Sequence, residues 1–144
     1  MTLAQALKKK NKLVKQINEK KKRVRENNSI LTTNTRSYVI ADLRKDLAGL
    51  TDELIALKVQ IQTANVPILA KIYQLSEMKD QIAFLRSVST TVGKITNHYH
   101  NTAETVFQAE LTAVEVDTEV EALEAKIELL QEEIDTFNHK KKIN

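Results

Sequence analysis

The sequence of 144 residues contains no cysteine and no tryptophan, and it has only two glycines and one proline. The absence of cysteine excludes disulfides, thiolate metal sites and cysteine nucleophiles. Ordinary glycine and proline usage is about 7% and 5%, so this scarcity disfavours turn-rich β-sandwiches and Gly-dependent nucleotide folds. No apolar run approaches the roughly 20 residues of a membrane-spanning helix, and no secretory signal pattern follows the basic N-terminus. We therefore expect a cytoplasmic protein.

The chain is rich in charge, and that charge is unevenly distributed. The first 25 residues carry ten Lys/Arg and one acidic residue, whereas residues 104–137 carry eleven Asp/Glu and one Lys. The net charge of the whole chain is only +3. Because both stretches are amphipathic at helical spacing, they predict two helices with complementary faces that pair within one chain or between chains.

Apolar residues recur at spacings of three and four along most of the chain. They predict four helices, over residues 3–26, 39–64, 67–88 and 113–138. The second is the clearest, because all eight positions of its predicted core-facing line, or seam, from Ile40 to Ala64 are apolar. Pro67 is expected to end it by pushing Val66 out of the α region. Gly93 is a candidate C-cap for the third helix.

Residues 95–112 fit two interpretations, and both stay open. Ile95, Tyr99 and Val106 follow helical spacing, whereas Phe107 and Leu111 fit the alternation of an extended segment. The rest of the pattern predicts an all-α fold, an elongated antiparallel helical hairpin or four-helix bundle with coiled-coil seams in a single domain. Helices this long with such narrow seams usually complete their core against another copy, so we expect a homo-oligomer.

Catalysis and metal binding have little support in the sequence. There is no Gly-rich phosphate loop, and the acidic residues of the last helix recur at positions expected to face solvent. His98 and His100 could share one face of a strand, but a metal site needs three or four convergent ligands. We expect a protein that is not an enzyme, with no catalytic residues, no metal and no cofactor.

The basic stretch Lys8–Arg25 allows three interpretations. Binding to nucleic acid would give a steep salt dependence, but no aromatic residue for base stacking is interleaved with the cations. A helix lying on a membrane surface usually has a bulky apolar face, which is lacking here. A solvated face paired with the acidic helix requires nothing further, and we favour it. Nucleic acid and membrane are therefore disfavoured partners.

Two clusters of polar residues coincide with two predicted connections, the one between the first and second helices and the one between the third and fourth. These connections lie at the same end of an up-down bundle. Their cations suit phosphate groups, and their Tyr and His rings suit stacking on a planar ligand. The alternative is that both are ordinary polar loops. The candidate ligand-binding residues are Arg23, Arg25, Asn28, Arg36, Tyr38, Arg86, Thr90, Lys94, His98 and Tyr99.

The order of segments resembles a bacterial and phage family labelled septicolysin-like. Similarity is carried by LAQALKKKNKLVKQI (Leu3–Ile17), IQTAN (Ile61–Asn65), Ile68–Arg86 and VEVDTEVEALEAKIELLQEEIDTFN (Val114–Asn138). The chain departs from the family at Leu75 and Ser76, where an Arg-Asp pair is usual. It also departs at Val66-Pro67, which replaces a longer Gly-containing loop. The family's lytic label has no mechanism that maps onto these residues.

The resemblance implies an intracellular, non-enzymatic helical protein encoded by a phage and acting in the host cytoplasm. By analogy of class, such proteins include counter-defence sponges that sequester a host immune nucleotide. We therefore expect an oligomeric binding protein that sequesters a small, phosphate-bearing ligand. The alternative is a coiled-coil structural or adaptor protein that recruits a protein partner, and nucleic-acid binding through the basic first helix is a weaker alternative.

Overall fold

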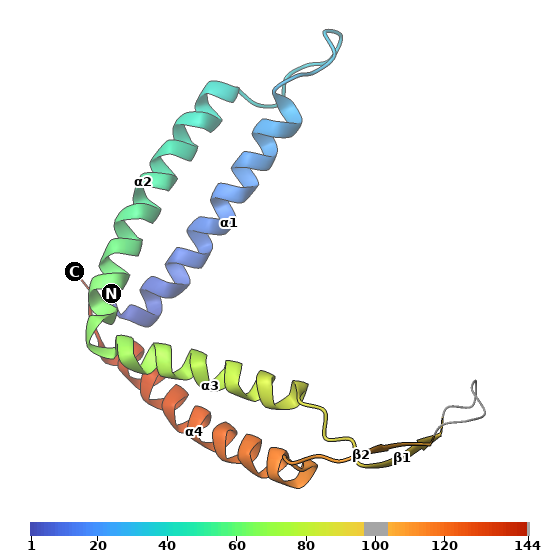
Figure 1. Cartoon of the computed structure of the whole chain (residues 1–144). Coiled ribbons are helices and arrows are strands. Elements are labelled where there is room, and N and C mark those ends of the chain that lie inside the picture. Colours follow the sequence, from blue (N-terminus) through green and yellow to red (C-terminus); the bar gives the residue numbers. More distant parts are fainter. Residues whose placement is uncertain (97–103, 144) are drawn as a thin grey trace. The chain divides into compact units, whose positions relative to one another are not determined.

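The computed structural model describes residues 1–96 and 104–143, which are mostly helical (Figure 1). The elements are α1 (Leu3–Asn27), α2 (Ile40–Asn65), the 3₁₀ turn η1 (Val66–Ile68), α3 (Leu69–Ser87), β1 (Gly93–Thr96), β2 (Glu104–Phe107) and α4 (Ala113–Lys140). The predicted mostly helical fold is confirmed, with the addition of a small sheet that an all-α class does not contain. Within the described residues, every helix is too short or too polar to cross a bilayer.

The chain divides into two compact units, and α4 contributes residues to both. Unit 1 comprises Met1–Ile68 and Asp135–Asn144, and unit 2 comprises Leu69–Ile134. A compact unit is a geometric property, whereas a domain is a unit of cooperative folding. The single domain expected from the sequence therefore stays a prediction.

In unit 1, α1 and α2 form an antiparallel hairpin (Figure 1). Lys9 Nζ lies 2.6 Å from Glu53 Oε1, and Lys20 Nζ lies 2.9 Å from Asp46 Oδ2. Later residues of α1 thus face earlier residues of α2, as an antiparallel pair requires. The hairpin closes over an aliphatic core of Leu3, Ala6, Leu13, Leu57, Ile61, Ala64 and Ile143.

The two ends of the chain are bonded to each other at the base of this hairpin. The Leu3 amide donates to the Lys141 carbonyl oxygen at 2.7 Å, and the Ile143 amide donates to the Met1 carbonyl oxygen at 3.0 Å. Thr2 and Gln5 form a capping box at the start of α1, as the T-x-x-Q pattern allows. These bonds carry Ile143 into the core, where its side chain is only 8% exposed.

In unit 2, α3 and α4 form a second antiparallel hairpin. Lys71 pairs with Glu133, and Arg86 Nη2 lies 2.7 Å from Glu124 Oε1. The core consists of Ile82, Leu85, Val116, Val120 and Leu123. A second capping box begins α4, in which the Glu115 amide donates to Thr112 Oγ1 at 3.2 Å and the Thr112 amide to Glu115 Oε2 at 2.9 Å.

Between α3 and α4, β1 and β2 pair antiparallel, with Gly93 opposite Phe107. The extended interpretation of residues 95–112 is therefore the one observed where the structure describes them. Gly93 does not cap α3, which already ends at Ser87. Gly93 instead begins β1 with φ at +91°, a left-handed conformation that side chains with a Cβ rarely adopt.

Pro67 has a different effect from the one predicted. Val66 stays in the α region, with φ −47° and ψ −45°, and its amide donates to the Thr63 carbonyl oxygen. The residue before proline is disfavoured in the α region but not forbidden there. The backbone therefore tightens into η1 and continues into α3 from Leu69, so Pro67 does not occupy the first position of α3.

Candidate functional site

The α1–α2 turn, residues 28–39, is bonded to the C-terminal end of α1 by an arginine. Arg36 Nη1 donates to the Asn27 carbonyl oxygen at 2.8 Å, and Arg36 Nη2 donates to the Asn28 carbonyl oxygen at 3.2 Å. These carbonyls have no partner within the helix, and the partial negative charge of a helix C-terminus favours a cation there. Arg36 thus has a structural role, which leaves three of its five N–H donors for other partners.

The same turn brings a second arginine against a tyrosine. The guanidinium carbon of Arg23 lies 5.5 Å from the centroid of the Tyr38 ring, within the range of a cation–π contact. A hollow of about 360 Å³ adjoins it, lined by Asn28, Arg36, Ser37, Tyr38, Val39 and Ile40. Four predicted ligand-binding residues, Arg23, Asn28, Arg36 and Tyr38, therefore lie together, whereas Arg25 is exposed on α1 and does not line this hollow.

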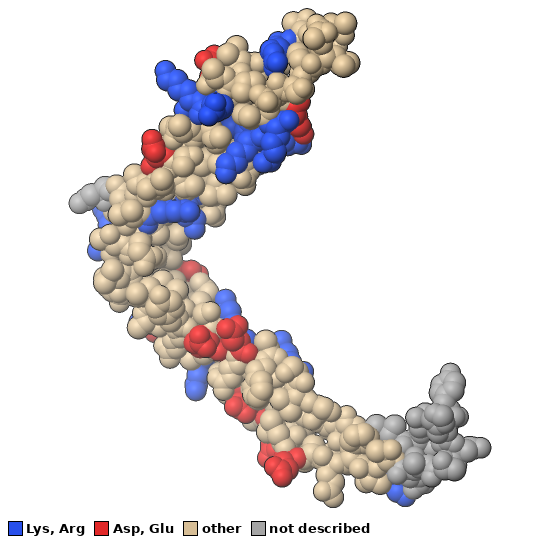
Figure 2. Space-filling model, turned by 45° about the horizontal axis from the view of Figure 1, so that its top comes forward, with Lys and Arg blue, Asp and Glu red and all other residues tan. Residues whose placement is uncertain are grey.

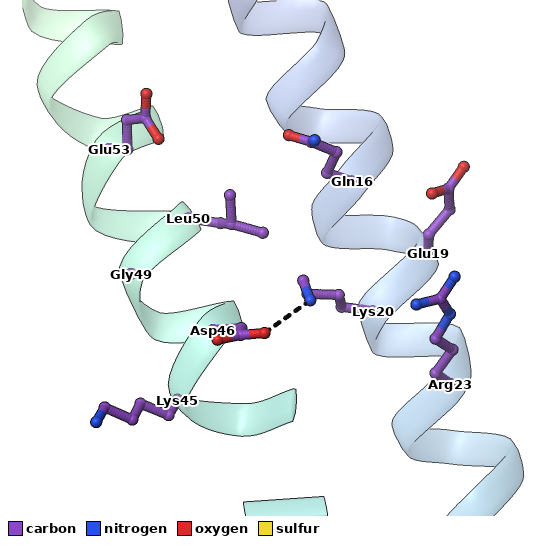
Figure 3. A pocket seen from close by; sticks show the side chains of 9 residues that line it. All are labelled: Gln16, Glu19, Lys20, Arg23, Lys45, Asp46, Gly49, Leu50 and Glu53. Atoms are coloured by element: carbon purple, nitrogen blue, oxygen red, sulfur yellow. Dashed lines mark hydrogen bonds and ion pairs between the residues drawn. The ribbon is translucent and has the colours of Figure 1, made fainter. Parts of the chain in front are cut away.

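A larger groove of about 600 Å³ runs between α1 and α2 (Figure 3). Its lining residues are Gln16, Glu19, Lys20, Arg23, Lys45, Asp46, Gly49, Leu50 and Glu53. Lys20 reaches across it to Asp46, and Lys45 points away from α1. Three cations and three carboxylates line the groove, so it has no net preference for an anion.

Gly49 lies in this groove, where a Cβ added to it would have no atom within 4 Å. Glycine weakens a helix relative to alanine, and the fold around Gly49 does not require its small size. The groove was not predicted from the sequence. The available signal was Gly49, a lone glycine inside an otherwise regular apolar pattern.

The predicted residues of unit 2 that the structure describes, Arg86, Thr90 and Lys94, do not form a common anion site. Arg86 is paired with the carboxylate of Glu124, which competes with any phosphate for the guanidinium. Thr90 is half-buried, and Lys94 belongs to β1. His98 and Tyr99 lie outside the described residues. Because the two polar clusters belong to different units, their meeting at one end stays a prediction.

Among residues 1–96 and 104–143, no group of three His, Asp or Glu side chains converges closely enough to hold a metal ion. His100, like His98, lies outside these ranges.

Both hairpins also present apolar side chains to solvent, away from their cores. On the outer face of α2, Ile55 is 55% exposed and Val59 is 62% exposed, and the same line continues to Val66 in η1. We call these three residues the α2 outer stripe. On α3 the exposed aromatic residues are Tyr73 and Phe84. The sequence pattern predicted one apolar seam for each helix and missed these second faces.

Comparison of the chain with protein-family models, curated proteins and solved structures gives no match. The resemblance to the septicolysin-like family therefore stays a prediction.

Proposed function

We propose that this chain is a non-enzymatic helical binding protein that acts as an oligomer of identical copies. The observation that carries the proposal is the α2 outer stripe. A helix that is apolar on two opposite faces normally lies inside a bundle, and α2 has one such face against α1 and another in solvent. A second copy would cover the exposed face and supply the further helices of the expected bundle.

The cores of the two units support the same conclusion. Each core is formed mainly by facing seams of two helices, and among the described residues only Leu3 and Ala6 are completely buried. A single layer of helix-on-helix contact removes little apolar area from water, so added contacts between copies contribute strongly to stability.

Native mass spectrometry tests the proposal directly. The wild-type protein should have the mass of an oligomer, and the double variant I55S/V59S should shift towards the monomer because it makes the stripe polar. The control is Leu31→Ser, which changes an apolar residue of the α1–α2 turn that is 70% exposed. A wild-type protein that stays monomeric would contradict the proposal. It would favour the adaptor alternative, in which another protein covers the stripe.

A second candidate function, sequestration of a small phosphate-bearing ligand, is favoured by the cluster of Arg23, Arg36 and Tyr38. Its two guanidinium groups and one ring match the phosphate and planar parts of a nucleotide. A protein that captures such a nucleotide would fit the counter-defence role expected from the resemblance.

Calorimetric titration with nucleotides tests this candidate. Uptake with micromolar or tighter affinity should disappear in Arg23→Ala, and also in Arg86→Ala if the two polar clusters meet. Lys8→Ala is the control, because Lys8 is an exposed cation on α1 outside the cluster. Unchanged binding by Arg23→Ala would remove the α1–α2 turn from the site. A nucleotide-sized mass that co-purifies with the native oligomer would identify the ligand class.

A further inference from the structure

The two units carry opposite net charges. Unit 1 has 17 Lys/Arg and seven Asp/Glu, a net charge of +10, whereas unit 2 has five Lys/Arg and 12 Asp/Glu, a net charge of −7. Figure 2 shows the basic side chains gathered on the α1–α2 hairpin. Contacts between like units of two copies would place charges of the same sign together. Contacts between unlike units are electrostatically favoured.

The α2 outer stripe has cations along both edges and one acidic residue. Arg44 and Lys58 lie along one edge of the line through Ile55 and Val59, whereas Lys45 and the exposed Asp52 lie along the other edge, at helical spacing. Arg44 and Lys58 are exposed, and no ion pair involves them within the described part of the chain. The stripe thus combines branched apolar side chains with one positive edge, formed by Arg44 and Lys58.

The face of α4 opposite its core has the complementary character. It carries Val114, Thr118, Ala122, Ala125 and Leu129 at spacings of four and three, and we call these residues the α4 outer stripe. Val114 is 74% exposed and Leu129 is 64% exposed. The small side chains at its centre leave room for branched side chains of a partner helix. Glu121, Glu128 and Glu132 border the stripe, and all three are exposed.

From these two surfaces we infer that the α2 outer stripe of one copy packs on the α4 outer stripe of a second copy. This inference rests on the proposed oligomer and names its interface. Ile55 and Val59 lie against the small residues of α4, a pairing of large with small side chains that fills space well. In an antiparallel arrangement Lys58 then lies level with Glu121, and Arg44, 14 residues or about 21 Å away along α2, lies nearest to Glu132.

Charge reversal on each side provides the test. Variant R44E/K58E makes the border of α2 acidic, and variant E121K/E128K makes the border of α4 basic. Each variant alone has two stripes of like charge, so its dimerisation affinity should fall by at least about tenfold. An equimolar mixture should reassociate, because each stripe of one variant then meets its complement on the other. Masses are measured by native mass spectrometry and light scattering at about 50 mM salt, where surface charges are weakly screened.

The matched control is K8E/K15E, which reverses the same amount of charge on exposed positions of α1 away from either stripe. It should remain an oligomer, and all variants should keep the helical circular dichroism of the wild type. If a charge-reversal variant loses its helical circular dichroism, the neutral variants R44Q/K58Q and E121Q/E128Q replace the two charge-reversal variants. Each should then associate more weakly and with a smaller salt dependence than the wild type.

The outcomes separate the interface from the proposed function. A monomeric wild-type protein overturns both. An oligomeric wild type whose mass is unchanged in both reversal variants overturns this interface and leaves the proposed oligomer standing. Dissociation of each variant without reassociation in the mixture also overturns it, because the two stripes then do not face each other. Dissociation followed by reassociation into a mixed oligomer supports it.

Discussion

Ile143 offers the most direct test of how unit 1 is held together. Its side chain is 8% exposed and packs in the core with residues of α1 and α2, although it lies beyond the end of α4. Its amide bonds to the Met1 carbonyl oxygen at 3.0 Å, a bond that an alanine would keep. The substitution Ile143→Ala therefore removes side-chain packing alone.

The expected loss follows from that burial. Removing a buried isoleucine side chain destabilises a protein by about 2–5 kcal/mol, and the value depends on how far the site can relax. A hollow of about 300 Å³ adjoins Ile143 and is lined also by Val59 and Thr63. Water and neighbouring side chains can enter the vacated space from it, so we expect the lower half of the range, about 2–3 kcal/mol.

Urea denaturation followed by far-UV circular dichroism measures the effect. With an m-value of about 2 kcal/mol/M, the unfolding midpoint of Ile143→Ala should fall by about 1 M. The protein concentration is held constant, because association stabilises the folded state by mass action. The control is Leu31→Ala, at a position that is 70% exposed, which should change stability by less than about 0.5 kcal/mol. If Ile143→Ala unfolds at the same midpoint as the control, Ile143 is not part of the core.

Other substitutions test single backbone and capping features by the same titration. Gly49→Ala should raise the free energy of unfolding by about 1 kcal/mol, because alanine favours the helix and its Cβ meets no atom. A decrease would show that Gly49 makes a close contact that the single chain lacks. Gly93→Ala should lower it by about 1 kcal/mol, because φ is +91° there. Thr112→Ala should lower it by about 1 kcal/mol through loss of the α4 capping box, and an unchanged midpoint would mean that α4 starts elsewhere.

The helical seams of α2, α3 and α4 could be predicted because only one face of each helix has an apolar residue at every position of a regular seam. From Ile40 to Ala64 every predicted seam position of α2 is buried or half-buried, and the same holds for α4 from Val116 to Phe137. In these helices an apolar residue occupies each seam position. A shift of register would have placed charged residues in the core, so the spacing alone identifies the face.

The seam of α1 was predicted in the wrong register around its middle. Spacings of three and four from Leu3 predict Val14 and Lys21 among the core-facing residues of the first helix, but Leu13 is buried and Val14 is exposed. Because Leu13 and Val14 are adjacent and lysines are frequent along α1, the sequence is compatible with either residue facing the core. Only packing against α2 decides between these two registers. Lys20 is accommodated at the edge of the interface because its stem packs inward while its ammonium reaches Asp46.

The candidate site was harder to predict because its residues have structural roles that spacing does not reveal. Asn28, Arg36 and Tyr38 line one hollow, since a short turn keeps them close in sequence. That Arg36 donates to the last carbonyls of α1 depends on the turn geometry, which composition does not specify. The pairing of Arg86 with Glu124 joins residues 38 positions apart and depends on the alignment of α3 with α4. An arginine in a polar cluster is therefore a candidate ligand for phosphate only after its hydrogen bonds and ion pairs within the fold are counted. Arg36 and Arg86 both make such bonds, so Arg23 is the strongest candidate of the three arginines.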